Sequence, residues 1–266
     1  MDIILALFFF LTGTAVGSFL NVCIWRMPRE ESVVMPPSHC PKCNYRLGPL
    51  DLVPLFSFLL LKRRCRKCKT PISWRYFIIE FLTGLVFLAL FFACFPDRYW
   101  DLPFYLIFAA CLVAIFVIDL EHMIIPDELV IAGFAAATLR ALGEIFGLVA
   151  TADRGLMLIS PPGTDWGFRF PEFLVGAVVG FLFFVAIELF ARLLFRKEGM
   201  GGGDMKLGAA IGALLGPGLA LLSFGMAVVA GAVVGIFLLA WRRKKRVDYI
   251  PFGPFMVATA FLIMLI

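Results

Sequence analysis

The chain has 266 residues, of which 62% are hydrophobic and 16% are charged, and its mean hydropathy is +0.96. Ordinary globular domains are about 45–50% apolar and about 25% charged, so this composition excludes a soluble globular domain, a disordered chain, a collagen-like fibre and a secreted disulfide scaffold. The net charge is +5, and the composition as a whole predicts an all-α polytopic membrane protein.

About eight membrane-spanning helices are predicted, because a helix needs about 20 apolar residues to cross a bilayer. Their ranges are 3–25, 76–95, 103–120, 128–149, 172–195, 206–221, 223–241 and 251–266. Gly216-Pro217-Gly218 predicts a turn between the sixth and seventh helices. Glycines at four-residue spacing predict close helix packing, and they are Gly13/Gly17, Gly176/Gly180, Gly208/Gly212/Gly216 and Gly231/Gly235.

The first apolar run could be taken for a signal peptide, but it has no basic residue before it and carries Asp2 instead. Arg26 and Arg29 follow it directly. We therefore interpret residues 1–25 as an uncleaved first transmembrane helix with its N-terminus outside the cell.

Residues 26–75 form the one sizeable polar segment, which is too short to build a soluble core without a metal or a cross-link. Two C-x-x-C pairs can supply that link, and their cysteines are Cys40, Cys43, Cys65 and Cys68. The spacing of the two pairs is close to that of four-thiolate zinc sites. The sequence therefore predicts a small loop domain closed by a structural zinc ion.

Disulfides and a thioredoxin-like redox pair are the alternatives for these cysteines. Disulfides are disfavoured in the reducing cytosol, where the charge pattern described below places the loop, and a redox pair lacks its βαβ context. His39, beside Cys40, is predicted to support a ligand or to take no part rather than to bind the metal. Cys23, Cys94 and Cys111 lie in or beside apolar runs and are predicted to be inert.

Two carboxylates lie at the ends of predicted spans. Ionisable groups are energetically costly near the membrane interior, so each of them calls for a functional or structural explanation. Asp119 ends the third span, and Asp204 follows three glycines near the start of the sixth. Two neighbouring carboxylates do not both ionise easily, so one can act as a base on water while the other, protonated, polarises a carbonyl. The glycines allow close approach of backbone or peptide. This pattern is typical of aspartic-protease chemistry.

Structural explanations for these acids remain open at the level of the sequence. Asp204 could form an ion pair with Lys206 or Lys197 instead. Asp127 follows Pro126, a favoured first helical residue, so it is predicted to satisfy amides and the dipole at a helix start. Spacing alone does not decide between catalysis and ion pairing.

Basic residues indicate the orientation, because cytoplasmic loops carry an excess of Lys and Arg. Of the 24 Lys and Arg, eleven fall in residues 26–75, four in residues 192–206 and five in the run Arg242–Arg246. Eight spans put all three segments on one side, which is predicted to be cytoplasmic. We interpret Arg242–Arg246 as a topology determinant near anionic headgroups, so no nucleic-acid partner is predicted.

Several of these motifs together resemble those of the type IV prepilin peptidase family. The run D-L-E-H-x-I-I-P-D, which begins at Asp119, and G-G-G-D-M-K-L at residues 201–207 are similar to the two aspartate motifs of that family, the second of which is G-x-G-D. Residues 17–22 read G-S-F-L-N-V. With the paired cysteines and Glu80, they resemble the long bacterial form of the family.

The resemblance implies a polytopic inner-membrane aspartic endopeptidase that removes the basic leader from type IV prepilins or pseudopilins at the cytoplasmic face. Asp119 and Asp204 would be its catalytic pair, and the four cysteines would bind its metal. It also implies N-methylation of the new N-terminus with S-adenosylmethionine, whose binding residues the sequence does not identify. The expected division is a first helix at 1–25, a zinc-binding loop at 26–75 and a transmembrane aspartic peptidase domain at 76–266.

The chain departs from the long-form pattern at three places. Arg63-Arg64-Cys65 stands where many relatives carry Gly-Arg before the third cysteine, and Leu52-Val53-Pro54 replaces Asn-Ile-Pro. Both lie in the region linked to methylation, so the chain is expected to be either bifunctional or a peptidase alone. Residues 147–171 are predicted to form a longer outside loop than the family usually needs.

The rival hypothesis is a non-enzymatic membrane protein, either a zinc-stabilised scaffold or a transporter. A transporter would place its ionisable groups near the bilayer midplane, whereas the acids of this sequence cluster at one predicted face. The sequence does not identify the pilin, the secretion or pilus system, or the oligomeric state.

Overall fold

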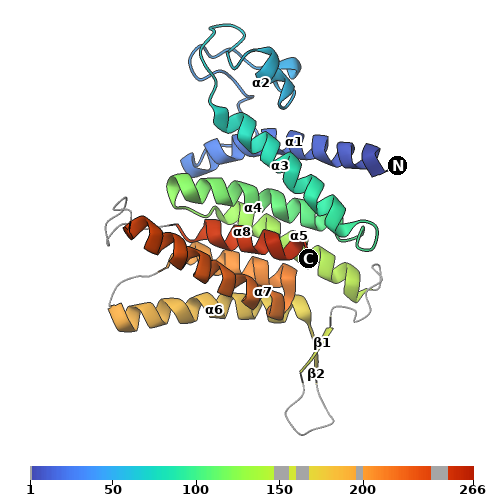
Figure 1. Ribbon diagram of the computed structural model, residues 1–266, viewed down its shortest axis with the longest axis vertical. Helices are drawn as coiled ribbons and strands as arrows, with labels where there is room; N and C mark the ends of the chain where they lie inside the picture. Colours follow the sequence, from blue (N-terminus) through green and yellow to red (C-terminus); the bar gives the residue numbers. More distant parts are fainter. Residues whose placement is uncertain (1, 147–155, 160–167, 196–199, 241–250) are drawn as a thin grey trace. The chain divides into compact units, whose positions relative to one another are not determined.

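The computed structural model describes residues 2–146, 156–159, 168–195, 200–240 and 251–266 (Figure 1). Most of these residues are helical, which confirms the predicted helical class. The chain divides into two compact units, Met1–Leu102 and Pro103–Ile266. The predicted zinc loop belongs to the first unit, and both predicted catalytic aspartates belong to the second.

The first unit consists of two long helices and the polar segment between them. Its elements are α1 (Asp2–Arg26), η1 (Met27–Arg29), η2 (Pro49–Asp51), α2 (Phe56–Leu60) and α3 (Trp74–Cys94). Ser73 begins α3 by accepting a hydrogen bond from the N–H of Arg75. The guanidinium of Arg26, at the end of α1, is buried and donates to the carbonyls of Ser32 and Pro36, so it ties the polar segment to the helix.

Glycines bring α1 and α3 into backbone contact, as their spacing predicts. A Cβ atom at Gly17 would lie 2.8 Å from the Cα of Glu80, and one at Gly13 would lie 2.7 Å from the carbonyl oxygen of Thr83. Side chains larger than hydrogen would push the two helices apart at both positions.

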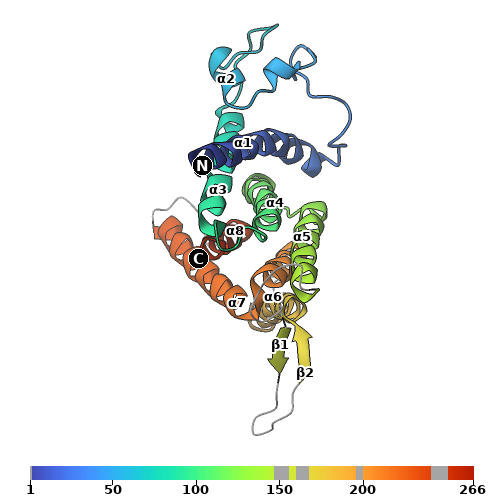
Figure 2. The same ribbon diagram turned by 90° about the vertical axis from the view of Figure 1, so that its right-hand side faces the viewer.

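The second unit contains the remaining helices and a short hairpin. Its elements are α4 (Leu102–His122), α5 (Asp127–Ile145), β1 (Leu156–Ile159), β2 (Phe168–Pro171), α6 (Glu172–Phe195), α7 (Gly202–Ala240) and α8 (Gly253–Met264). The antiparallel strands pair Leu156 with Pro171 and Ile159 with Phe168, and they lead into α6 (Figure 2). They lie within the long loop predicted at 147–171; the rest of that loop, up to residue 167, falls outside the described residues.

Helices α6 and α7 lie side by side with glycine against glycine (Figure 1). Positions for a Cβ at Gly176 and Gly212 collide with the carbonyl oxygen of the other glycine. At Gly180 the obstacle is the carbonyl of Gly208, so the predicted close packing is confirmed here. Gly231 meets only phenylalanine rings at 3.6 Å, an ordinary contact.

The turn predicted at residues 216–218 is found within α7, which consists of two helices joined across a kink at Gly216. Gly216 has φ 74° and ψ 169°, which are not helical, and Pro217 follows it inside α7. A positive φ strains any residue with a Cβ, and a Cβ here would also collide with the Glu172 carboxyl. The chain therefore turns at Gly216, as predicted, and the ring of Phe184 lies against both Gly208 and Phe224, eight residues before and after the turn.

Five helices in the described part of the chain are long and apolar enough to cross a membrane: they begin at Ile3, Trp74, Leu102, Glu172 and Gly202. The predicted count of eight is not confirmed. Helix α8 has only 12 residues, and α5 carries several charged residues, including Arg140 and Glu144. The sixth and seventh predicted spans share α7. The basic run Arg242–Arg246 lies outside the described residues.

Candidate active site and metal centre

The four cysteines of the polar segment come together in the first unit. The sulfur atoms of Cys40, Cys43, Cys65 and Cys68 all lie within 4.8 Å of one another. The Cys40 and Cys68 sulfurs are 3.8 Å apart and those of Cys43 and Cys65 are 3.9 Å apart. Four thiolates around zinc at about 2.3 Å stand about 3.8 Å from one another, so the donor set fits a tetrahedral ion.

The two C-x-x-C pairs fold alike, which explains how they present four sulfurs to one point. The N–H of Asn44 donates to the carbonyl of Cys40 at 2.9 Å. The N–H of Lys69 donates to the carbonyl of Cys65 at 3.0 Å in the same way. Asn44 and Lys69 each follow the second cysteine of a pair and have φ of 53° and 59°. Each pair is thus a tight turn closed by a left-handed residue.

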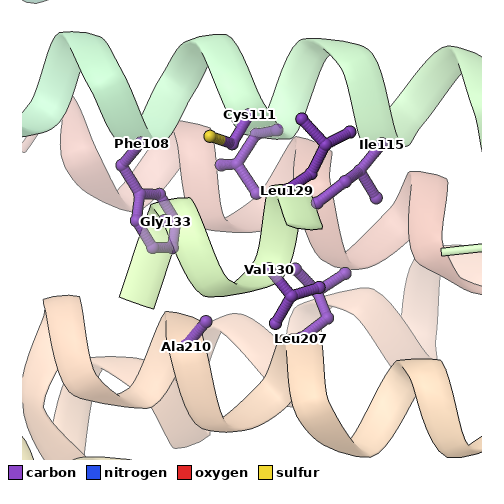
Figure 3. Close-up of a pocket in the computed structure, with 9 residues that line it drawn as sticks. Phe108, Cys111, Ile115, Leu129, Val130, Gly133, Leu207 and Ala210 are labelled. Atoms are coloured by element: carbon purple, nitrogen blue, oxygen red, sulfur yellow. The ribbon is translucent and has the colours of Figure 1, made fainter. Parts of the chain in front are cut away.

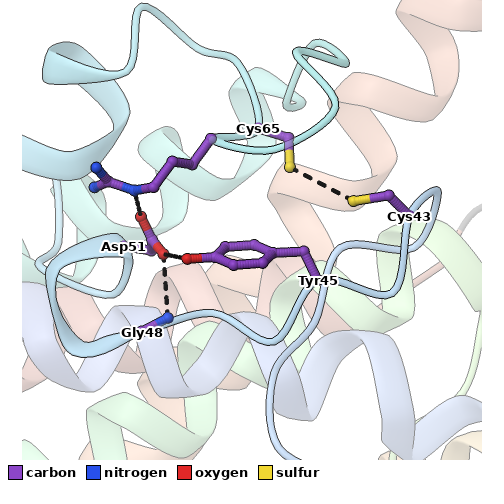
Figure 4. Close-up of polar contacts among 6 residues, drawn as sticks. Cys43, Tyr45, Gly48, Asp51 and Cys65 are labelled. Atoms are coloured by element: carbon purple, nitrogen blue, oxygen red, sulfur yellow. Dashed lines mark hydrogen bonds and ion pairs between the residues drawn. The ribbon is translucent and has the colours of Figure 1, made fainter.

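The carboxylate of Asp51 joins the two turns (Figure 4). It accepts hydrogen bonds from the Tyr45 hydroxyl and the Gly48 N–H, both at 3.1 Å, and from Nε of Arg66 at 2.6 Å. Its side chain is only 4% exposed. Burial raises the pKa of Asp51, but the three donors outweigh it and the pKa is lowered below its usual value.

The thiols differ in their affinity for protons. Hydrogen bonding to the hydroxyl and backbone of Thr70 lowers the pKa of Cys68 to about 6. The Tyr45 N–H lowers the pKa of Cys43, but desolvation and the neighbouring thiols together raise it to about 11. A metal that binds all four sulfurs must therefore displace protons, which makes metal binding dependent on pH.

Other residues that the sequence analysis considered lie outside the cysteine cluster. His39 is exposed, its Nδ1 lies 3.1 Å from the carbonyl oxygen of Pro37, and it is not among the grouped ligand residues. Cys23, Cys94 and Cys111 are buried. Glu80, on α3, is buried and accepts a 2.8 Å hydrogen bond from the N–H of Leu55. This bond connects the polar segment to α3.

The two predicted catalytic aspartates approach each other in the second unit. Asp119 lies in the last turn of α4 and is 5% exposed, and Asp204 lies in the first turn of α7. Their carboxyl groups interact electrostatically. Oδ2 of Asp119 is fully buried and accepts no hydrogen bond from the described residues. An unpaired buried carboxyl oxygen is rare in folded proteins and calls for a functional explanation.

The glycine run before Asp204 shapes this meeting point. The N–H of Gly201 donates to the Asp204 carboxylate at 3.3 Å, and the Asp204 N–H donates back to the Gly201 carbonyl at 3.1 Å. A Cβ at Gly203 would lie 2.9 Å from the Cβ of Ile125, but one at Gly202 would meet nothing within 4 Å. Gly203 is thus the position where close approach requires glycine.

Lys206 does not pair with Asp204, as the ion-pair alternative supposed. Its ammonium group donates to both carboxylate oxygens of Asp127 at 2.8 Å. Asp127 lies in the first turn of α5, as its helix-start interpretation requires. Lys197, the other alternative partner, lies outside the described residues.

Sequence reasoning missed Glu188, a buried acid that contacts the residue before the glycine run. Glu188, on α6, is 4% exposed, and it binds Arg192 one turn away. Its other oxygen accepts a 2.7 Å hydrogen bond from the N–H of Met200, the residue before the glycine run. A glutamate within the apolar run 172–195 was the available signal, because ionisable groups in spans are costly.

A small apolar pocket lies one helical turn from each aspartate (Figure 3). Ile115 precedes Asp119 by four residues, and Leu207 follows Asp204 by three. The rest of its lining comes from α4, α5 and α7: Phe108, Cys111, Leu112, Leu129, Val130, Gly133 and Ala210.

Comparison with known families matches both units. Residues 11–94 match the bacterial peptidase A24 N-terminal domain, and residues 106–236 match the type IV leader peptidase family. No solved structure matches the chain.

Curated relatives match over most of this chain. A protein of Myxococcus xanthus named prepilin leader peptidase/N-methyltransferase is 39% identical over 88% of this chain and 63% of its own length. One of the same name from Aeromonas hydrophila is 32% identical over 96% of this chain and 89% of its own. The type 4 prepilin-like proteins leader peptide-processing enzyme of Escherichia coli is 34% identical over 91% of this chain and 87% of its own length. The chain therefore belongs to the type IV leader peptidase family.

Proposed function

We propose that the chain is an inner-membrane aspartic endopeptidase that removes the leader from type IV prepilins or pseudopilins, with Asp119 and Asp204 as its catalytic pair. Family membership and the names of the relatives support the reaction. The observation that carries the assignment of residues is the unpaired, buried Oδ2 of Asp119 beside the carboxyl of Asp204.

The chemistry follows from two carboxyl groups that share one proton. The ionised carboxylate takes a proton from a water molecule, whose oxygen attacks the scissile carbonyl carbon. The protonated carboxyl donates a hydrogen bond and then its proton to the carbonyl oxygen. Collapse of the tetrahedral intermediate breaks the C–N bond, and a proton passes to the leaving amine.

The membrane arrangement is the second part of the proposal. Eight spans with the N-terminus outside would put residues 26–75, the end of α4 and the start of α7 on the cytoplasmic side. The clustering of Lys and Arg in residues 26–75 and 192–206 supports this orientation. A basic leader would then meet Asp119 and Asp204 at the membrane face, and its apolar continuation would stay in the bilayer.

For the loop at 26–75 we propose a structural zinc ion held by Cys40, Cys43, Cys65 and Cys68. The tetrahedral spacing of the sulfurs supports this assignment. With four thiolates the ion keeps no open position, so it would stabilise the loop rather than act on substrate. The remaining chain, residues 76–266, would form the transmembrane peptidase domain.

N-methylation of the new N-terminus is proposed as a second activity, because the relatives are named N-methyltransferases. S-adenosylmethionine would supply the methyl group to the amine that cleavage exposes. The family's N-terminal domain lies in the first unit, and the proposed catalytic aspartates lie in the second.

The experiment compares prepilin cleavage by the detergent-purified enzyme and its Asp119→Asn, Asp204→Asn and Asp127→Asn variants. The proposal predicts complete loss of cleavage for the first two, with their thermal melting retained, and near-parental cleavage for the third. Parental rates in Asp119→Asn and Asp204→Asn would overturn the catalytic pair. A parental enzyme that fails on a prepilin cut by another peptidase would favour the scaffold or transporter hypothesis.

A further inference from the structure

The first turn of α8 approaches the Asp119 carboxyl more closely than a side chain would allow. A Cβ atom at Gly253 would lie 2.6 Å from Oδ2 of Asp119 and 3.2 Å from its Cγ. Real Cβ atoms essentially never come within 3.0 Å of another heavy atom in this way. The observed position of the carboxyl is therefore compatible only with glycine at 253.

Backbone conformation does not explain this glycine. Among the described glycines, Gly216 is the one with a positive φ, and Gly253 lies within the helical range of α8. Pro254 follows it, in the first turn, where a missing N–H costs nothing. Alanine would be a better helix former than glycine at such a position. The requirement for glycine comes from the neighbouring carboxyl.

The Asp119 carboxyl has few other fixed contacts. Its Oδ2 accepts no hydrogen bond from the described part of the chain, and the residue is 5% exposed. The backbone N–H of Gly253 interacts with the carboxyl group. The start of α8 is therefore a principal restraint on where this carboxyl points.

Ile125 links the start of α8 to the first turn of α7, which carries Asp204. Its Cδ1 would lie 3.5 Å from a Cβ at Gly253, and its Cβ would lie 2.9 Å from a Cβ at Gly203. Two glycines thus flank one isoleucine, and three chain segments converge on the aspartate pair. A side chain at 253 would therefore have to displace the Asp119 carboxyl.

We propose that Gly253 is a positioning residue of the aspartate pair: its bare backbone lets α8 begin against the Asp119 carboxyl and so fixes the orientation of that carboxyl. The catalytic consequence rests on the proposed function. A methyl group at 253 displaces Oδ2, and a displacement of about 1 Å at a reacting group costs about 100-fold in rate.

The kinetic test compares Gly253→Ala with Gly225→Ala in the purified enzyme. Gly225, on α7 in the same unit, has nothing within 4 Å of its Cβ position, so it is the matched control. Gly253→Ala is expected to lower kcat about 100-fold with KM unchanged, because the methyl touches the carboxyl and not the substrate, and to alter the pH–rate profile. Gly225→Ala should match the parent in kcat, in KM and in the pH–rate profile. Parental kcat in Gly253→Ala would overturn the proposal.

A thermal double-mutant cycle tests the contact even if Gly253→Ala is too unstable to assay. The contact predicts that Gly253→Ala lowers the melting temperature of the parent but has a much smaller effect in an Asp119→Ala background, where the carboxyl is gone. An equal effect in both backgrounds would overturn the proposal. This result does not depend on catalysis, so failure of the contact is distinguishable from failure of the proposed peptidase activity.

Discussion

Lys206 and Asp127 form a two-pronged ion pair that joins the start of α7 to the start of α5, with both hydrogen bonds at 2.8 Å. Both side chains are more than half exposed. The pair engages Lys206, two residues after Asp204 in the sequence, with Asp127 instead. It also gives Asp127 a structural role that differs from that of Asp119, although the two acids belong to one motif.

The ion pair predicts a mild effect for Asp127→Asn. Exposed pairs contribute about 0–1 kcal/mol, because solvent screens the charges and the side chains lose rotamer freedom. We expect a small decrease in melting temperature that disappears at high salt, with cleavage near the parental rate. Melting curves at low and high salt check this. Loss of cleavage as complete as in Asp119→Asn would contradict the structural role.

Arg63 is predicted to strain the metal loop. Its φ is 59°, in the left-handed region, where a residue with a Cβ costs about 1–2 kcal/mol and glycine does not. Its guanidinium lies 5.6 Å from the ring centre of Trp74, a contact that offsets part of this cost. Arg63→Gly should therefore stabilise the loop by up to about 1 kcal/mol.

The matched control for Arg63→Gly is Lys67→Gly, since Lys67 is not among the residues with a positive φ. Glycine there should destabilise the loop by its extra unfolded-state entropy, about 0.5–1 kcal/mol. Chelator resistance of the metal-loaded protein measures both effects. Equal responses to the two substitutions would show that Arg63 carries no backbone strain.

Asp51 predicts a pH-dependent contribution to metal retention. Its pKa in the folded loop lies below the usual 3.8, so its stabilising effect is complete above about pH 4 and is lost as the pH falls through the lowered value. Asp51→Asn should release metal faster at pH 5–7, where the parent keeps the charge. The difference should shrink as the pH falls through the lowered pKa of Asp51. A difference that grows as the pH falls would contradict the assignment.

Alanine substitutions at Gly202 and Gly203 are predicted to differ in their effect on thermal stability. Gly203→Ala forces its Cβ against Ile125 and should lower the melting temperature, whereas Gly202→Ala has open space around the new methyl group. Thermal melts of the two variants under one condition compare them directly. A larger decrease for Gly202→Ala would show that the contact with Ile125 does not govern this turn.

Local patterns in the sequence predicted much of this arrangement. The two C-x-x-C pairs predicted one metal cluster because each pair folds as an autonomous turn, and their sulfurs do converge. Four-residue glycine spacing predicted the backbone contact of α6 with α7, since it places small residues on one helix face. The catalytic roles of Asp119 and Asp204 remain predictions.

Features that depend on distant segments could not be predicted in this way. Nothing in the local sequence of Phe252-Gly253-Pro254 indicates that α8 begins against Asp119, because that contact joins positions more than a hundred residues apart. The sequence also did not identify Asp127 as the partner of Lys206, because this contact joins the start of α5 to the start of α7. The predicted count of eight spans is not confirmed, because α8 has only 12 residues and α7 contains two predicted spans joined at Gly216.

The most direct test of the account is intact mass spectrometry of a prepilin incubated with the purified enzyme and S-adenosylmethionine, beside the Asp204→Asn variant. The account predicts that the parental enzyme removes the leader and adds one methyl group, and that Asp204→Asn leaves the prepilin uncut. Leader removal without the methyl group would keep the peptidase and remove the second activity. Cleavage by Asp204→Asn at the parental rate would contradict the aspartate pair.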